Sequence, residues 1–226
     1  MPHPLSRRYC QPRAGQKFIV DDEEYQLEGE FGDGAAGIVR KARRLRDNAP
    51  RAVKFLAPDP KYIDEDVFDD VAARFRREGQ RAPFLTHDSL VKIYAYVENA
   101  EGQAFQNGNP KNPFILMQAV KGRTLESYIR RLANDREAKG EPKTFSLDPV
   151  RLSIALNIAS ALDYLHRRHL IHRDVKPANI FLPSHEGQAI SREALLGDFG
   201  IMKWGDFQAS MSTGTLTTTT QRGLGT

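Results

Sequence analysis

Cysteine is almost absent from this chain of 226 residues, because Cys10 is the only one. A single cysteine excludes an intrachain disulfide and a cluster of thiolate metal ligands. This composition suits a reducing compartment, so we expect a cytoplasmic protein. The chain also lacks any run of about 18 apolar residues, and we therefore expect no membrane-spanning segment within it.

A concentrated charge of one sign is also missing. The formal net charge is only +4, and basic residues are scattered among acidic ones. Because no basic stripe typical of nucleic-acid binding is present, we expect no nucleic-acid partner. The apolar fraction of 40% and the charged fraction of 27% indicate a globular protein with one large domain or two modest lobes. Residues 1–17 contain prolines and arginines without the apolar centre of a secretory signal, which predicts a flexible tail.

Apolar spacing predicts a first half made mostly of sheet. A long helix is predicted at residues 64–82, where Val67, Val71 and Phe75 recur four apart. Five strands are predicted, at residues 25–31, 38–42, 51–56, 90–97 and 114–120.

The second half is predicted to be mainly helical. A short helix is expected at residues 125–132 and a charged loop at 134–146. A long helix then begins with Asp148 as N-cap and Pro149 at its first position. Its core-facing positions are Ile154, Ile158, Leu162 and Leu165.

Gly32, Gly34 and Gly37 follow the first predicted strand with the spacing G-x-G-x-x-G. Dinucleotide-binding folds share this spacing, but their glycines open a helix and an acid follows about 20 residues later. Here the strand-like Ile38 and Val39 follow instead, without an acid at the equivalent place. The P-loop string G-x-x-x-x-G-K-[ST] does not occur. A hairpin whose glycines let the backbone approach phosphates fits better.

Residues 172–179 read His-Arg-Asp-Val-Lys-Pro-Ala-Asn, and Asp-Phe-Gly follows at 198–200. Asp174 can accept a proton from an attacking hydroxyl, and Lys176 adds a positive charge beside a transferred phosphoryl group. Asn179 and Asp198 bring the oxygen ligands that magnesium prefers. Together these residues match the parts needed for phosphoryl transfer.

A zinc site is an alternative for the histidines, because His166, His169 and His172 fall three apart. Neighbours at this spacing share one face of a helix. The strand-like residues 170–171 would interrupt such a helix, and we therefore expect no zinc there.

The two strings resemble the signature set of the eukaryotic-type (Hanks-type) Ser/Thr protein kinases, H-R-D-x-x-x-x-N and D-F-G. The context of Lys176 and Pro177 resembles bacterial members in particular. The resemblance implies an α+β, two-lobe fold, with a five-stranded antiparallel sheet and one helix at residues 18–120. A mainly helical second lobe would occupy 121–226, incomplete because the chain ends before the A-P-E segment. It further implies transfer of the γ-phosphate of ATP, with Mg²⁺, to Ser/Thr hydroxyls of protein substrates.

The resemblance also implies a role for individual residues. Asp174 would be the catalytic base, Lys176 would steady the γ-phosphate, and Lys54 would hold the inner phosphates with Glu78 as its ion-pair partner. The metal ligands would be Asn179 and Asp198. The implied nucleotide-binding set is Gly32, Gly34, Gly37, Val39, Ala52, Lys54, Met117, Gln118, Val120 and Phe181.

Residues 201–226 resemble an activation loop, with a low-complexity stretch rich in Ser, Thr and Gly at 210–220. At least one threonine between Thr213 and Thr220 is expected to be an autophosphorylation site. Arg173 would meet a phosphate placed there. Two other functions are possible: a non-catalytic kinase-like module that binds nucleotide or partners, and a small-molecule kinase of similar fold. Retention of every catalytic residue type argues against the first, and the Lys176-Pro177 context against the second.

Overall fold

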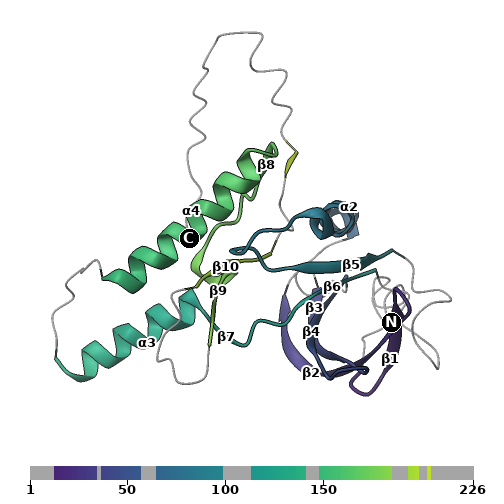
Figure 1. The fold of residues 1–226 in the computed structure, drawn as a ribbon, viewed down its shortest axis with the longest axis horizontal. Coiled ribbons are helices and arrows are strands. Elements are labelled where there is room, and N and C mark those ends of the chain that lie inside the picture. Colours follow the sequence, from purple (N-terminus) through teal and green to yellow (C-terminus); the bar gives the residue numbers. More distant parts are fainter. Residues whose placement is uncertain are drawn as a thin grey trace, which may run out of the picture.

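The computed structural model of this protein describes residues 13–34, 37–56, 65–98, 113–140, 148–184, 193–198 and 203–204. Figure 1 shows a curled sheet with helix α2 beside it, and two long helices, α3 and α4, that lie near several short strands. The sheet consists of β1 (Lys17–Val20), β2 (Glu23–Gly34), β3 (Gly37–Arg44), β4 (Pro50–Leu56), β5 (Ile93–Val97) and β6 (Phe114–Gln118).

The sheet has six strands in the order β1-β2-β3-β4-β6-β5, and every pairing is antiparallel. The five predicted strands are present, but the prediction of five was wrong because β1 was missed. Val20 pairs with Glu23, so only Asp21 and Asp22 connect β1 to β2. Their φ angles of 49° and 62° are both positive. This is the geometry of a tight two-residue hairpin, and Asp tolerates it better than most residues.

The glycine-rich sequence forms a β-hairpin, as predicted. Gly32 pairs with Val39 and Gly34 with Gly37, while residues 35–36 lie outside the described part of the chain. Register shifts in β2 on either side of Glu30 interrupt the regular pairing. Such bulges bend and twist a strand, consistent with the strong curl of β2 and β3 in Figure 1.

Helix α2 (Glu65–Arg81) and a 3₁₀ turn, η1 (Ala82–Phe84), agree closely with the predicted helix at 64–82. The next strand was predicted to start at residue 90, but β5 begins at Ile93. Leu90 instead forms an isolated parallel bridge with Leu196, which lies more than a hundred positions later in the chain. The segment before β5 therefore links the sheet to the second half of the molecule.

Helix α3 (Leu125–Ala138) extends beyond the predicted residue 132, so the beginning of the expected loop is helical. The sequence is consistent with this, since i,i+4 pairs such as Arg131 and Asp135 support an exposed helix. Helix α4 (Pro149–His166) begins as predicted, because Asp148 accepts a hydrogen bond from the Arg151 backbone N–H at 2.9 Å.

Short strands complete the second half. β7 (Gly122–Thr124), β9 (Ile180–Pro183) and β10 (Leu195–Leu196) form an antiparallel sheet in the order β10-β9-β7. β8 (Leu170–Ile171) pairs with β11 (Lys203–Trp204), and η2 (Pro177–Asn179) is a 3₁₀ turn that precedes β9. Helix α4 and these strands hold the polar loop at residues 172–179 from both ends.

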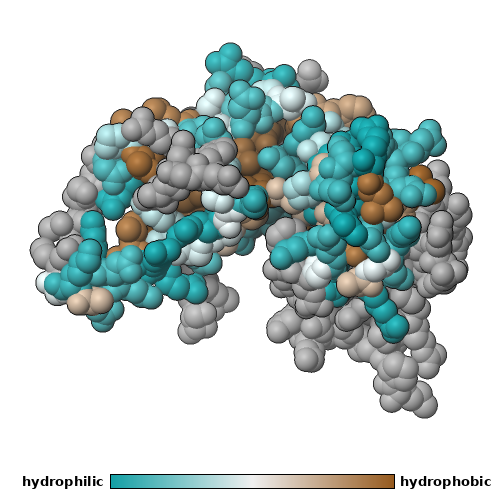
Figure 2. Space-filling view, turned by 60° about the horizontal axis from the view of Figure 1, so that its bottom comes forward, coloured by the Kyte–Doolittle hydropathy of each residue, from teal (hydrophilic) through white to brown (hydrophobic). Residues whose placement is uncertain are grey.

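Two hydrophobic clusters pack on opposite faces of the six-stranded sheet. The smaller cluster includes Phe18, Phe55 and Phe114. The larger cluster joins α2 and the sheet to α4 and the short strands, through residues such as Phe75 and Leu165. Among the coloured atoms of Figure 2, hydrophilic residues predominate and hydrophobic residues are visible in several separate places, the middle of the view among them. In the described part of the chain, no helix combines the length and apolar character needed to cross a membrane.

Candidate active site

The site begins on one face of the six-stranded sheet. Lys54 in β4 lies opposite Val39 of β3, and Ala52, two positions earlier, lies opposite Met117 of β6. Because side chains alternate between faces along a strand, this register places the four residues on the same face. Four members of the predicted nucleotide-binding set are therefore neighbours, although they come from three strands.

Glu78 projects from α2 toward this face and forms an ion pair with Lys54. The Lys54 Nζ lies 3.2 Å from Glu78 Oε2 and 3.3 Å from Oε1. The Glu78 side chain is only 4% exposed and that of Lys54 is 15% exposed. The earlier acids of α2, Asp69 and Asp70, are exposed instead. A carboxylate this deeply buried requires its cationic partner, since an unpaired buried charge is strongly unfavourable.

Asp198 reaches the same lysine from the second half of the chain. Its Oδ1 lies 2.9 Å from Lys54 Nζ, so the ammonium bridges two carboxylates. Burial by itself would lower the pKa of Lys54, but the charges and hydrogen bonds of Glu78 and Asp198 outweigh it and raise the pKa above its ordinary value. Lys54 therefore remains a fixed positive charge at neutral pH. The sequence did not predict this direct contact.

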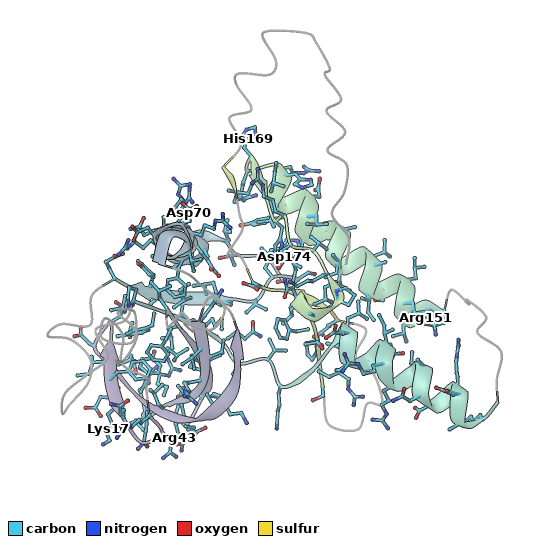
Figure 3. All side chains as sticks on the ribbon, turned by 180° about the vertical axis from the view of Figure 1, so that it is seen from behind. Lys17, Arg43, Asp70, Arg151, His169 and Asp174 are labelled. Carbon is cyan, nitrogen blue, oxygen red and sulfur yellow. The ribbon has the colours of Figure 1, made fainter. Side chains whose placement is uncertain are left out.

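Asp174, Lys176 and Asn179 form the opposite side of the site. Figure 3 shows Asp174 in the middle of the molecule, between the sheet with α2 and the two long helices. Its Oδ2 accepts hydrogen bonds from Asn179 Nδ2 at 2.8 Å and from Lys176 Nζ at 2.9 Å. Asn179 Nδ2 also donates to the Asp174 carbonyl at 2.9 Å. The hydrogen bond from Lys176, with a further one from Asn179, lowers the pKa of Asp174 and keeps it ionised.

Two hydrogen bonds to the backbone of Gly197 hold this loop against the segment that carries Asp198. The Gly197 carbonyl accepts a hydrogen bond from His172 Nε2 at 3.1 Å, and the Gly197 N–H donates to the Asn179 carbonyl at 2.9 Å. Arg173 and Asp198 both have left-handed backbone, with φ of 66° and 62°. Such conformations are unfavourable for non-glycine residues and are often found at functional sites. The two segments therefore form one connected unit.

Gly197 also permits close packing beneath the site. A Cβ at this position would lie 2.9 Å from Phe181 Cε2 and 2.9 Å from Val91 Cγ2. Glycine thus lets the Phe181 ring of β9 lie against the segment before Asp198. Phe181 was predicted from the sequence, but the need for a glycine at position 197 beside its ring was not, because no local pattern links positions so far apart.

Three members of the predicted nucleotide-binding set, Met117, Gln118 and Val120, lie at or just after the end of β6, whose last residue is Gln118. The Gln118 backbone N–H donates to the Lys92 carbonyl at 2.8 Å, and its side-chain Oε1 accepts from the Lys92 N–H at 3.2 Å. Gln118 is thus tied to the neighbouring segment by both backbone and side chain. Val120 lies beyond the strand and is half-buried.

The three histidines occupy different surroundings. His172 is 1% exposed and turned toward Gly197, whereas His166 and His169 are exposed. Within the described ranges, no three His, Cys, Asp or Glu side chains gather as a metal site. The predicted magnesium ligands are Asn179, at the end of the 172–179 loop, and Asp198, which directly follows Gly197. The hydrogen bonds of Gly197 join these two segments. One amide and one carboxylate oxygen suit Mg²⁺, which binds proteins through few ligands and retains waters.

Of the predicted activation loop, the structure describes only Lys203 and Trp204, which pair with Ile171 and Leu170. The Thr-rich residues 210–220 lie outside the described residues, as do residues 1–12 of the predicted tail. Arg173, the predicted partner of a phosphate, is exposed two positions after β8.

Comparison with known families matches residues 25–220 to the protein kinase domain. The chain therefore belongs to the protein kinase domain family.

Individual relatives agree with this assignment. The chain is 33% identical over 193 residues to the serine/threonine-protein kinase PknF of Mycobacterium tuberculosis, covering 85% of this chain and 35% of that protein. It is 32% identical over 190 residues to a probable serine/threonine-protein kinase PknB of Bifidobacterium longum, covering 84% of this chain and 24% of that protein. Among solved structures, it resembles the M. tuberculosis PknI kinase domain with a TM-score of 0.56 and 28% identity. That match covers 84% of this chain and 62% of the PknI chain. The two-lobe kinase fold expected from the sequence is thereby confirmed.

Proposed function

We propose that this chain carries the ATP-binding and catalytic machinery of a protein kinase that phosphorylates Ser and Thr hydroxyls of proteins. The observation that supports it best is the pair of charge clusters at the site. On one side Lys54 bridges Glu78 and Asp198, and on the other Asp174 is held by Lys176 and Asn179. Phosphoryl transfer depends mainly on such positioning and charge neutralisation.

The nucleotide would lie between the sheet and β9. Val39 and Ala52 would contact one face of the adenine ring and Phe181 the other, with Met117 at the inner edge. Gln118 N–H already donates to Lys92, so backbone groups of Ala119 and Val120 are the better candidates to hydrogen-bond adenine. The backbone of Gly32, Gly34 and Gly37 would cover the phosphates, and Lys54 would contact the inner ones.

Magnesium would be held by the side-chain oxygens of Asn179 and Asp198. When bound, the ion would neutralise phosphate charge. Asn179 Nδ2 is committed to Asp174, which leaves the amide oxygen as its metal-ligating atom.

Asp174 would orient the substrate hydroxyl and accept its proton. The hydroxyl oxygen forms a bond to the γ-phosphorus while the bond from that phosphorus to the β,γ-bridging oxygen breaks, which releases ADP. Lys176, which is half exposed, can turn from Asp174 to the transferred phosphoryl group and offset its charge. The lowered pKa of Asp174 favours orientation of the hydroxyl over early removal of its proton.

The proposal extends to the setting of the enzyme. Residues 18–120 would form the nucleotide-binding lobe and residues 121–226 part of the catalytic lobe. The tail predicted at residues 1–17 would end earlier, because Gly15 and Gln16 form backbone hydrogen bonds with Leu27 and Lys17 begins β1. We propose protein substrates and a cytoplasmic location. We also propose no nucleic-acid partner, consistent with the mild net charge of +4.

Transfer of radioactive phosphate from ATP to a generic protein substrate tests the proposal. It should be measured for this chain and for a version extended by the PknI segment that this chain does not cover, each with Asp174→Ala as control. We expect Mg²⁺-dependent labelling of Ser and Thr that the control abolishes. Nucleotide binding without labelling in both versions would support the non-catalytic alternative instead.

A further inference from the structure

Gly79, the residue after Glu78 in α2, lies directly against β5. A Cβ at Gly79 would lie 2.1 Å from Cδ2 and 2.5 Å from Cγ of the Tyr96 ring. Both distances are too short for two carbon atoms that are not bonded to each other, so one of the two segments would have to shift. The absence of a side chain at Gly79 therefore sets how closely α2 approaches the sheet beside Lys54.

A strand irregularity turns Tyr96 toward the helix. Ile93 belongs to the hydrophobic cluster on the α2 side and Tyr96 packs against it, whereas Tyr94, Ala95 and Val97 pack against the cluster on the other face. Regular alternation would not place residues three apart on one face. The register shift between Ile93 and Ala95 accounts for this, since a bulge redirects the side chains that follow it.

The Tyr96 ring cannot easily give way. It contacts Phe75 of α2, with ring centroids 6.4 Å apart, and its hydroxyl donates to Glu98 Oε2. Glu98 also forms an ion pair with Arg76 of α2 at 2.7 Å. Because Cγ is the first ring atom, relief of the clash requires rotation about the Cα–Cβ bond or movement of a backbone. Rotation would break the contact with Phe75 and the hydrogen bond to Glu98.

The same packing extends to the ion pair between Lys54 and Glu78. Phe75 contacts the Tyr96 ring and is also near Lys54, whose Nζ is 5.9 Å from the Phe75 ring centroid. Glu78, adjacent to Gly79, is the buried partner of that lysine. We propose that Gly79 and Tyr96 are positioning residues, which place α2 so that Glu78 meets Lys54. The proposal rests on the nucleotide-binding role given to Lys54 above.

A double-mutant cycle with Gly79→Ala and Tyr96→Ala tests this in both the chain and the extended version. Alanine in a helix normally stabilises relative to glycine. We expect Gly79→Ala instead to lower unfolding stability, and to reduce kcat/KM for ATP ten- to a hundredfold. Tyr96→Ala removes the ring that a Cβ at Gly79 would meet. In the Tyr96→Ala background, Gly79→Ala should therefore cost at most half of the logarithm of kcat/KM that it costs in the wild-type background. Gly29→Ala in β2 is the control for a glycine-to-alanine change without a clash, since a Cβ there meets nothing within 4 Å.

Three results would overturn the proposal. The first is wild-type stability and kcat/KM in Gly79→Ala, and the second is an equal loss from Gly79→Ala with and without the Tyr96 ring. The third is a change in unfolding stability with no change in kcat/KM for ATP in an active enzyme. The unfolding cycle requires no nucleotide. If wild-type protein neither binds nor hydrolyses ATP, the proposed function fails, while absence of coupling between the two substitutions in urea unfolding would still reject the packing relationship.

Discussion

Single side chains at this site act through charge that is shared between distant parts of the chain. Lys54 is central, because it contacts a carboxylate from α2 and another from the segment after β10. Removal of its ammonium should therefore affect both phosphate binding and the local electrostatics. These two effects can be separated by changing the buried partner as well.

We predict that Lys54→Met lowers phosphate transfer by about a hundredfold or more, because one preorganised electrostatic contact is lost. It should also lower the free energy of unfolding by on the order of 3 kcal/mol, because Glu78 is left buried without its cation. In Lys54→Met/Glu78→Gln the buried charge is gone, so stability should largely return while activity stays low. Urea unfolding and radioactive transfer measure the two quantities. Full activity in the single variant would reject the role of Lys54.

The lowered pKa of His172 leads us to predict that the free energy of unfolding depends on pH. Burial lowers its pKa below the ordinary value, although the hydrogen bond to Gly197 opposes the shift. Since the unfolded chain binds the proton more tightly, this contribution is fully present above about pH 6.5 and is lost as pH falls through the folded pKa. The slope from this group is at most about 1.4 kcal/mol per pH unit.

His172→Gln provides the comparison, because the glutamine amide can still donate to the Gly197 carbonyl but does not titrate. We expect the variant to lose less stability than wild type between pH 7 and pH 5, as measured by urea unfolding at each pH. Parallel curves for the two proteins would show that His172 does not cause the acid loss.

At the scale of the secondary-structure elements, helices and strands position the side chains of the site. Helix α4 delivers the chain to the 172–179 loop, and its first turn is fixed by Asp148. This carboxylate both caps the Arg151 N–H and lies 3.2 Å from the Arg151 side chain. The capping bond should dominate, because both side chains of the ion pair remain partly open to solvent and such pairs contribute little.

We therefore predict that Asp148→Ala lowers the free energy of unfolding by about 1 kcal/mol. Asp148→Asn should be close to wild type, since asparagine caps a helix as well as aspartate does. Thermal or urea unfolding of the two variants decides between the roles. Equal losses in both would assign the stabilisation to the ion pair with Arg151.

The sheet and the later helices are joined by a continuous core and by polar bridges. The Ser89 hydroxyl donates to Asn157 Oδ1 at 3.0 Å, and the Thr86 N–H donates to the Tyr164 hydroxyl at 3.0 Å. Leu165 of α4 belongs to the same apolar cluster as Phe75 of α2 and Ile115 of the sheet. The two halves should accordingly unfold in one transition.

Leu165→Ala tests this connection, because Leu165 is fully buried. We expect a loss of about 2–5 kcal/mol that also reduces amide protection in β4 and β6 by hydrogen exchange. Leu156→Ala in the same helix is the control, since Leu156 is 61% exposed and should change stability little. Undiminished protection of the sheet in Leu165→Ala would mean that the halves unfold separately.

Much of the fold followed from local sequence. Periodic apolar residues predicted α2 and α4, and the Asp148-Pro149 pair predicted where α4 starts. The glycine spacing followed by β-branched residues predicted a hairpin. These predictions succeeded because each signal depends only on the backbone conformation of a few neighbouring residues. β1 was missed since its turn uses two aspartates, and α3 was predicted too short, as its charged last turn was assigned to the following loop.

The sequence by itself determined which residue types are available for phosphate chemistry and roughly where helices and strands form. Only the tertiary structure decided that Lys54 contacts Asp198 as well as Glu78, that Gly197 admits the Phe181 ring, and that Gly79 admits the Tyr96 ring. The physical reason is that each of these contacts joins residues on separate segments. Their distances depend on how α2, the sheet and the later strands pack together, and no periodicity within one segment records that packing.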